Sequence, residues 1–225
     1  PVPLERRRQA PSLHKTAVLF LIIIATVPAA WLAYNAWVFG NPLEFATGPY
    51  SARGIAERTA DPNFPHHPGF HDVLLARQYF LKSAKLNVGD GVWQHLWGPV
   101  VGAGVLLMLI FGRRLWPLLL LAIPVAFYSG SIAYGGVPIF MPVWYPFSYY
   151  NVRYGLQMLP AIAVFSGLAL FFALTLLRSS KLRLAAVLGA ATLLAGSVAS
   201  VWKTVPICLR EAQANSSTRI PFERK

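Results

Sequence analysis

A single arginine, Arg153, lies where an aromatic and proline-rich segment gives way to a long apolar one. Tyr149 and Tyr150 precede it, and Tyr154 follows it directly. A guanidinium group forms forked hydrogen bonds to phosphate oxygens, so a cation among aromatic rings at a membrane boundary suits a lipid phosphate. An arginine at a helix end also reaches the interface simply as an anchor. The setting favours phosphate binding by Arg153 and Tyr154, with anchoring as the alternative.

Three more cations, Arg77, Lys82 and Lys85, lie in a segment from about 71 to 88 that is too short and too polar to span a membrane. At about 100° per residue, a helix there carries an apolar stripe on one side: Val73, Phe80, Ala84 and Val88. The two lysines fall on another side, which predicts a short amphipathic helix along the membrane surface. Its cations either draw a phosphate-bearing lipid toward a cavity or simply lie among anionic headgroups.

His66, His67, His71 and Asp72 form the only dense group of side chains that could ligate a metal. Imidazole and carboxylate groups bind zinc and other divalent ions. Their spacing matches no established motif, and adjacent histidines do not readily share one small ion. We therefore expect no cofactor here. A divalent metal, acid-base catalysis by one histidine and ordinary hydrogen bonding in a loop are the three alternatives.

The elements that position these residues are membrane helices. The chain is 56% hydrophobic and only 12% charged, and about 20 consecutive apolar residues suffice to cross a bilayer as a helix. Five segments qualify, at about 16–39, 93–111, 115–134, 154–177 and 182–202. The sequence thus predicts an all-α integral membrane protein with a spanning region at 16–203, outer loops at 40–92 and 135–153, and one interfacial helix.

Basic residues alternate between the connecting segments, and an excess of Lys and Arg marks the cytoplasmic side. Residues 1–15 and the two short turns after the second and fourth spans carry these cations, with Glu5 as the one acid among them. The other seven acids lie in the outer loops and in the segment 204–225. We therefore expect a plasma (inner) membrane protein with a cytoplasmic N-terminus and a periplasmic or extracellular C-terminal end.

The net charge of +12 is explained by this topology and by anionic lipid, which argues against nucleic acid as a partner. The single cysteine, Cys208, excludes a disulfide within the chain. Within the first outer loop, a short helix at about 51–59 would bring Arg53 and Glu57 one helical turn apart, where they can pair. The chain begins at Pro1 and ends just inside an outer segment, so we expect it to be part of a longer protein.

The segment 152–165, VRYGLQMLPAIAVF, resembles the Arg-Tyr-x-Leu-x-x-Leu-Pro-x-x-Ala pattern of late membrane helices in C-type glycosyltransferases. These enzymes use polyprenyl-phosphate-linked sugars and include the dolichyl-phosphate-mannose protein mannosyltransferases and the lipid A aminoarabinose transferases. The segments 41–50, 67–71 and 209–216 resemble uncharacterised bacterial members. Together these segments extend the resemblance over most of the chain.

This resemblance implies a membrane enzyme that moves a sugar from a polyprenyl phosphate to an acceptor glycan, lipid or protein on the outer face. It implies contact of Arg153 and Tyr154 with the lipid phosphate. The family places its catalytic carboxylate in a first outer loop near the N-terminus, and no acidic pair precedes Thr16. We therefore assign no catalytic role to Glu44 or Asp61, and we expect this chain to be inactive by itself.

Two other classes remain alternatives to a glycosyltransferase. A transporter subunit would be expected to carry ionisable groups inside its spans, and the five spans contain almost none. A non-catalytic membrane scaffold would show the same topology but would tolerate changes at Arg153. For a glycosyltransferase we expect Arg153→Ala in the full-length protein to abolish sugar transfer while leaving expression and membrane insertion intact.

Overall fold

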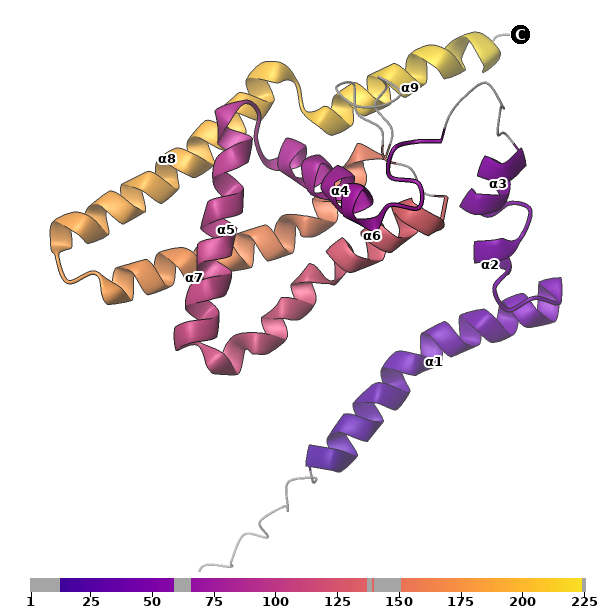
Figure 1. Cartoon of the computed structure of the whole chain (residues 1–225), viewed down its shortest axis with the longest axis horizontal. Coiled ribbons are helices and arrows are strands. Elements are labelled where there is room, and N and C mark those ends of the chain that lie inside the picture. The colour runs from indigo at the N-terminus through magenta and orange to yellow at the C-terminus, as the bar shows by residue number, and fades with distance from the viewer. Residues whose placement is uncertain (1–12, 59–65, 137–138, 140–150, 224–225) are drawn as a thin grey trace, which may run out of the picture. The chain divides into compact units, whose positions relative to one another are not determined.

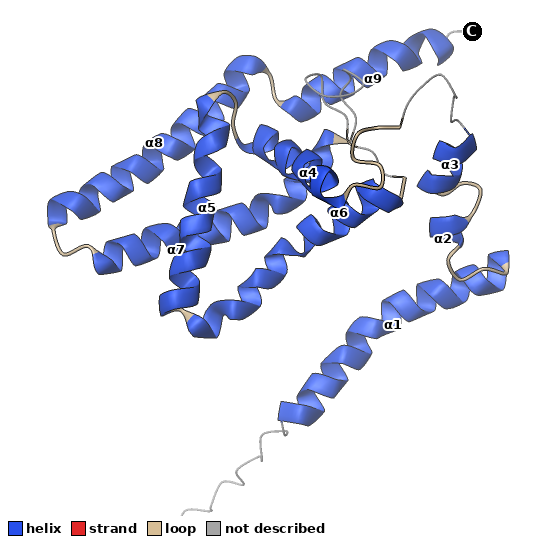
Figure 2. Ribbon diagram, viewed as in Figure 1, coloured by secondary structure: helices blue, strands red, loops and turns tan. Residues whose placement is uncertain are grey.

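The computed structural model describes residues 13–58, 66–136, 139 and 151–223 of the 225-residue chain. Every described secondary-structure element is a helix (Figure 2), so the all-α prediction is confirmed. The chain forms two compact units, Pro1–Ala60 and Asp61–Lys225, which are described separately below.

The first unit consists of one long helix and two short ones: α1 (Leu13–Phe39), α2 (Glu44–Thr47) and α3 (Ala52–Arg58). Asn41 closes the turn after α1, because its Oδ1 accepts the N–H of Leu43 at 3.0 Å and its Nδ2 donates to Thr47 Oγ1 at 3.0 Å. The predicted short helix is α3, and its Arg53–Glu57 ion pair is present at 2.8 Å. Both side chains are well exposed, so this pair stabilises α3 only slightly.

The second unit contains all the remaining helices (Figure 1). They are α4 (Val73–Val88), α5 (Val92–Phe111), the 3-10 helix η1 (Arg113–Ala122), α6 (Ile123–Tyr134), the 3-10 helix η2 (Val152–Met158), α7 (Leu159–Leu176), α8 (Ser180–Thr204) and α9 (Ile207–Glu223).

Five helical segments among the described residues are long and apolar enough to cross a membrane, the number that the sequence predicts. They are Lys15–Phe39, Val92–Phe111, Arg113–Tyr134, Val152–Leu176 and Ser180–Ala214. Two of them begin as 3-10 helices, η1 and η2, and become α-helical just before Pro124 and Pro160. These prolines lie in the first turn of α6 and α7, where a missing N–H costs no helical hydrogen bond.

Helices α5 and α7 cross at a point of close backbone contact (Figure 1). Gly104 of α5 lies directly against the backbone of Phe165 in α7, and a Cβ at this glycine would come within 1.8 Å of the Phe165 carbonyl oxygen. Small residues at such crossings allow membrane helices to approach closely. Helix α8 joins the same group through Trp97, whose Nε1 donates to Ser197 Oγ at 2.9 Å.

Helix α4 packs on η2 and α6. Its buried side chains are Ala76, Tyr79, Phe80, Ser83 and Ala84. Within the predicted apolar stripe, Phe80 and Ala84 are buried against protein, whereas Val73 is 41% exposed. The prediction that the apolar side of α4 faces lipid is therefore wrong for Phe80 and Ala84. Small side chains allow this burial, since a Cβ on Gly155 of η2 would lie 2.5 Å from the Ala84 nitrogen.

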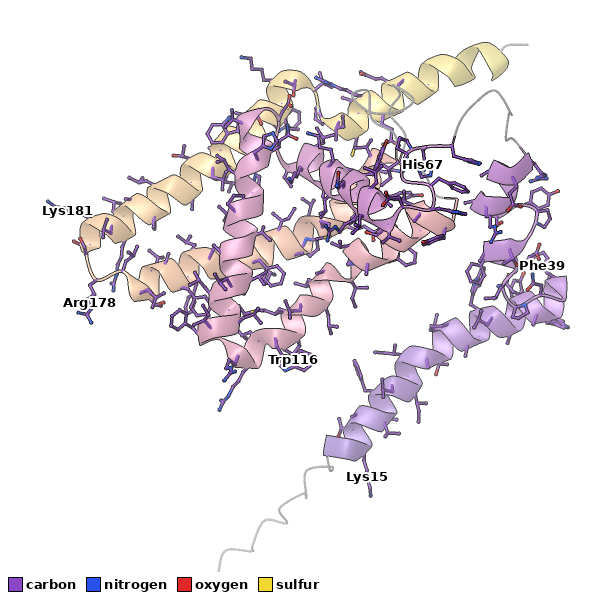
Figure 3. The ribbon with its side chains drawn as sticks, viewed as in Figure 1. Lys15, Phe39, His67, Trp116, Arg178 and Lys181 are labelled. Atoms are coloured by element: carbon purple, nitrogen blue, oxygen red, sulfur yellow. The ribbon has the colours of Figure 1, made fainter. Side chains whose placement is uncertain are left out.

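The two short basic turns of this unit lie away from α4. Figure 3 shows Trp116 of η1 at one edge, and Arg178 and Lys181 at the turn between α7 and α8, all far from His67 beside α4. The α4 side also carries the start of η2 and the start of α9, because both contact α4. Arg153 and the basic turns therefore lie at opposite ends of the helices in this unit.

Candidate functional site

The site around Arg153 is built on an unusual turn at the start of η2. Asn151 has a left-handed backbone, with φ at 59°, a conformation that asparagine adopts more readily than most residues. The N–H of Asn151 donates to Glu211 Oε1 at 2.9 Å, and the N–H of Arg153 donates to Glu211 Oε2 at 3.2 Å. Two backbone donors of the turn therefore point at one carboxylate, which belongs to α9.

The Arg153 side chain completes this arrangement. Its Nη1 donates to Glu211 Oε1 and forms an ion pair with it, and its guanidinium carbon lies 5.5 Å from the centre of the Tyr154 ring. Glu211 is only 2% exposed, whereas 53% of the Arg153 side chain is exposed. The pair thus has a buried anionic partner and a cationic partner that still reaches solvent.

A column of stacked rings lies beneath Arg153. Tyr154 stacks on Tyr128 of α6 with ring centres 5.2 Å apart, and Tyr128 stacks on Phe80 of α4 at 4.7 Å. Gln157 Nε2 donates to the Tyr128 hydroxyl at 2.6 Å. The column connects α4, α6 and η2, so the position of the Tyr154 ring depends on all three helices.

Helix α9 is held against this turn by its first residues. Ile207 is buried, and the Cys208 thiol donates to Asn87 Oδ1 at 3.0 Å. Asn87 in turn donates from Nδ2 to the Val152 carbonyl at 2.9 Å and to the Ser83 carbonyl at 2.8 Å. The same face of α9 that carries Glu211 is therefore fixed to α4 and η2.

Sequence reasoning missed Glu211, which we had placed only within an outer terminal segment. One signal was present: Glu211 is the only acid between Asp90 and Glu223. It is therefore the only carboxylate in that long stretch of chain that Arg153 could pair with. The ion pair also changes the expectation for Arg153→Ala, because that substitution leaves a buried carboxylate without its cation.

The cations of α4 lie in a different place from the Arg153 ion pair. Lys82 Nζ donates to Gln94 Oε1 at 2.9 Å, at the start of α5. Burial and the nearby charge of Lys85 lower the pKa of Lys82, and Asp90 partly opposes this shift. Arg77 is exposed on α4. The structure thus brings Arg153 and Tyr154 together, while Lys82 turns toward α5 at the same end of the unit.

The four residues considered as candidate metal ligands make aromatic and capping contacts. His66 and His71 stack on the two sides of Phe70, with ring centres 4.0 and 4.1 Å away. Asp72 caps α4 by accepting the Leu75 N–H at 2.9 Å. Burial, and to a smaller extent His66, lowers the pKa of His67. Within the described ranges, no group of three His, Cys, Asp or Glu side chains is placed to hold a metal ion.

Part of the predicted outer surface lies outside the described residues. This applies to the loop residues Trp144, Tyr145, Tyr149 and Tyr150, whose rings would either belong to an aromatic belt at the level of the headgroups or offer flat faces to a sugar or a prenyl chain. The described site therefore consists of η2, the first turns of α9, and the parts of α4 and α6 packed on them.

Comparison with known proteins identifies no relative of this chain. No protein-family model matches the chain, and neither a curated protein nor a solved structure does.

Proposed function

We propose that this chain is part of a membrane glycosyltransferase that moves a sugar from a polyprenyl phosphate to an acceptor on the outer face, with Arg153 and Tyr154 contacting the lipid phosphate. The observation that supports this proposal best is the exposure of Arg153. More than half of its side chain reaches solvent even though it is ion-paired. Its guanidinium is therefore available to an incoming anion.

The position of Arg153 also supports the proposal. It lies at the start of the Val152–Leu176 candidate span, and the ends of a span that crosses a bilayer lie near the lipid headgroups. Arg77, Lys82 and Lys85 lie on α4, which packs on η2. They would attract anionic lipid to this end of the unit. Each cation near the surface contributes about 1 kcal/mol to that attraction.

The chemistry assigned to these groups is limited to the leaving phosphate. When an acceptor hydroxyl attacks the anomeric carbon, the sugar–phosphate bond breaks and the bond electrons leave with the phosphate. A preorganised cation stabilises the negative charge that grows there. A base must also take the hydroxyl proton. We assign that role to no residue, since Glu211, the carboxylate nearest to Arg153, is buried and already accepts three hydrogen bonds.

The phosphate contact is tested by comparing two lipids that differ only in the terminal phosphate group. Purified protein in neutral nanodiscs is given radiolabelled polyprenyl monophosphate or the uncharged polyprenol, and the affinity ratio is measured. The variant Arg153→Gln/Glu211→Gln removes the whole ion pair and leaves no unpaired buried charge. We expect this variant to lose most of the preference for phosphate. A matched control, Arg53→Gln/Glu57→Gln, removes an exposed pair of the same type and should keep the preference.

A transfer assay separates the enzyme from its alternatives. Membranes that contain the full-length protein are given a polyprenyl-phosphate-linked radiolabelled hexose, and label reaching any acceptor fraction is measured. Transfer that depends on the Arg153 pair supports the glycosyltransferase. Phosphate preference without transfer would instead indicate a lipid-binding scaffold. Equal affinity for the phosphate and the alcohol would refute the proposed site.

A further inference from the structure

We infer that Glu211 is a positioning residue, which holds the Arg153 guanidinium in the orientation that receives a phosphate. This inference rests on the proposed function and adds to it a residue of α9 that touches no substrate. It depends on three features of the site: how the carboxylate is held, how much of the guanidinium it uses, and how its charge is compensated.

The carboxylate is fixed independently of the guanidinium. The backbone N–H groups of Asn151 and Arg153 hold one oxygen each, at 2.9 and 3.2 Å. The α9 backbone that carries Glu211 is tied down by buried Ile207 and by the Cys208–Asn87 hydrogen bond. Because Glu211 is 2% exposed, an incoming lipid phosphate does not displace it. Glu211 is therefore a fixed point on which a mobile side chain can be ordered.

The guanidinium uses only part of its donor set on this fixed point. Nη1 contacts Glu211 Oε1, and the guanidinium carbon lies over the Tyr154 ring, 5.5 Å from its centre. A guanidinium carries five N–H donors in a rigid fork, and half of this side chain remains exposed. The contacts with Glu211 and with the Tyr154 ring therefore fix the long Arg153 side chain, while the rest of its surface stays accessible.

The Glu211 carboxylate affects phosphate binding in two opposite ways: it repels the phosphate, and it orders the Arg153 side chain that binds the phosphate. Two backbone N–H groups and the guanidinium all donate to Glu211, and these donors offset much of its negative charge. Losing Glu211 would release a side chain with several rotatable bonds, whose ordering must then accompany binding. We expect the ordering effect to exceed the repulsion.

The test is Glu211→Gln, which keeps the shape and an acceptor oxygen but removes the charge. We expect the ratio of polyprenyl monophosphate to polyprenol affinity to fall about three- to tenfold, the effect of leaving one long side chain unordered. The affinity for polyprenol itself should not change, whereas a general loss of structure would lower both affinities. Glu57→Gln, the same change at the exposed pair of α3, should leave the ratio unchanged.

A second variant, Glu211→Asp, keeps the charge but draws the carboxylate back from Nη1, and it should lower the ratio less than Glu211→Gln does. An unchanged or increased ratio in Glu211→Gln would overturn the positioning role while leaving the proposed function intact. A wild-type protein without any preference for the phosphate would instead remove both. If Glu211→Gln does not fold, Glu211→Asp decides alone, and an unchanged ratio there would count against positioning.

Discussion

At the scale of single residues, Arg153 and Glu211 differ in how they would respond to loss of the ion pair, because Arg153 is half-exposed and Glu211 is buried. Arg153 can lose its partner and remain hydrated. Glu211 cannot, because its carboxylate is buried. Removing the arginine therefore leaves an unpaired buried charge, whereas Glu211→Gln leaves none.

This asymmetry gives a prediction about stability. Arg153→Ala should lower the free energy of unfolding by about 1–3 kcal/mol, because a buried charged acceptor loses its strongest donor. The cost is smaller than for a fully buried pair, since water reaches the arginine side of the site. Unfolding of the purified protein in detergent measures the change.

The companion double variant serves as the control for this prediction. Adding Glu211→Gln to Arg153→Ala removes the unpaired charge, and part of the lost stability should return. If the single variant is as stable as the wild type, the ion pair contributes nothing to the fold, and activity loss in Arg153→Ala could be read directly as loss of function.

Arg153 and Tyr154 could be singled out from the sequence, because an arginine with aromatic neighbours at the start of an apolar stretch is a local pattern. The pairing of Arg153 with Glu211 could not, because Glu211 lies 58 residues further along the chain. Helices α7 and α8 lie between the two residues in sequence. Spacing along the chain does not reveal that the start of α9 returns to the start of η2.

At the scale of helices, the contact between α5 and α7 depends on the absence of a side chain at Gly104. Gly104→Ala should separate the two helices or shift Phe165, at a cost of about 1–3 kcal/mol. Gly102, on the same helix, has open space where a Cβ would be. Gly102→Ala is therefore the matched control and should leave stability unchanged or slightly increased.

Thermal unfolding of both variants in the same detergent measures this difference. Equal melting temperatures for Gly104→Ala and Gly102→Ala would show that the crossing of α5 and α7 is looser than the structure has it. A lower melting temperature for Gly104→Ala alone would support the close backbone contact with Phe165.

The five helical segments long and apolar enough to cross a membrane could be predicted, because length and uniform hydrophobicity are sufficient signals for them. The burial of α4 could not. Its buried face includes Tyr79 and Ser83, and its exposed face includes Val73 and Leu74. In a protein that meets both lipid and water, an apolar stripe does not tell which surface covers it. The decisive feature is size, since small residues let η2 lie against the α4 backbone.

At the scale of the whole chain, the charge pattern predicts which end of the helices faces the cytoplasm. The basic turns and the Arg153 site lie at opposite ends of the second unit, so labelling one position at each end tests the orientation. In a Cys208→Ser background, Lys181→Cys and Ser216→Cys each introduce one thiol at an exposed position. Intact cells are then treated with a membrane-impermeant maleimide.

We expect the Ser216→Cys protein to be labelled in intact cells and the Lys181→Cys protein only after permeabilisation, because Lys and Arg are retained on the cytoplasmic side. Serine at position 208 still offers a donor to Asn87, so the background should fold. The reverse pattern of labelling would place Arg153 in the cytosol and would contradict sugar transfer on the outer face.

The packing of α4 on η2 has a consequence for biosynthesis. Asn87 and its acceptor on Val152 are 65 residues apart, and ribosomes add roughly 5–20 residues per second. For roughly 3–13 s, the buried rings of α4 have been synthesised but the segment that covers them has not. During that interval the nascent protein exposes the apolar face of α4. We therefore expect chaperones and quality-control proteases to bind the nascent chain during this part of its synthesis.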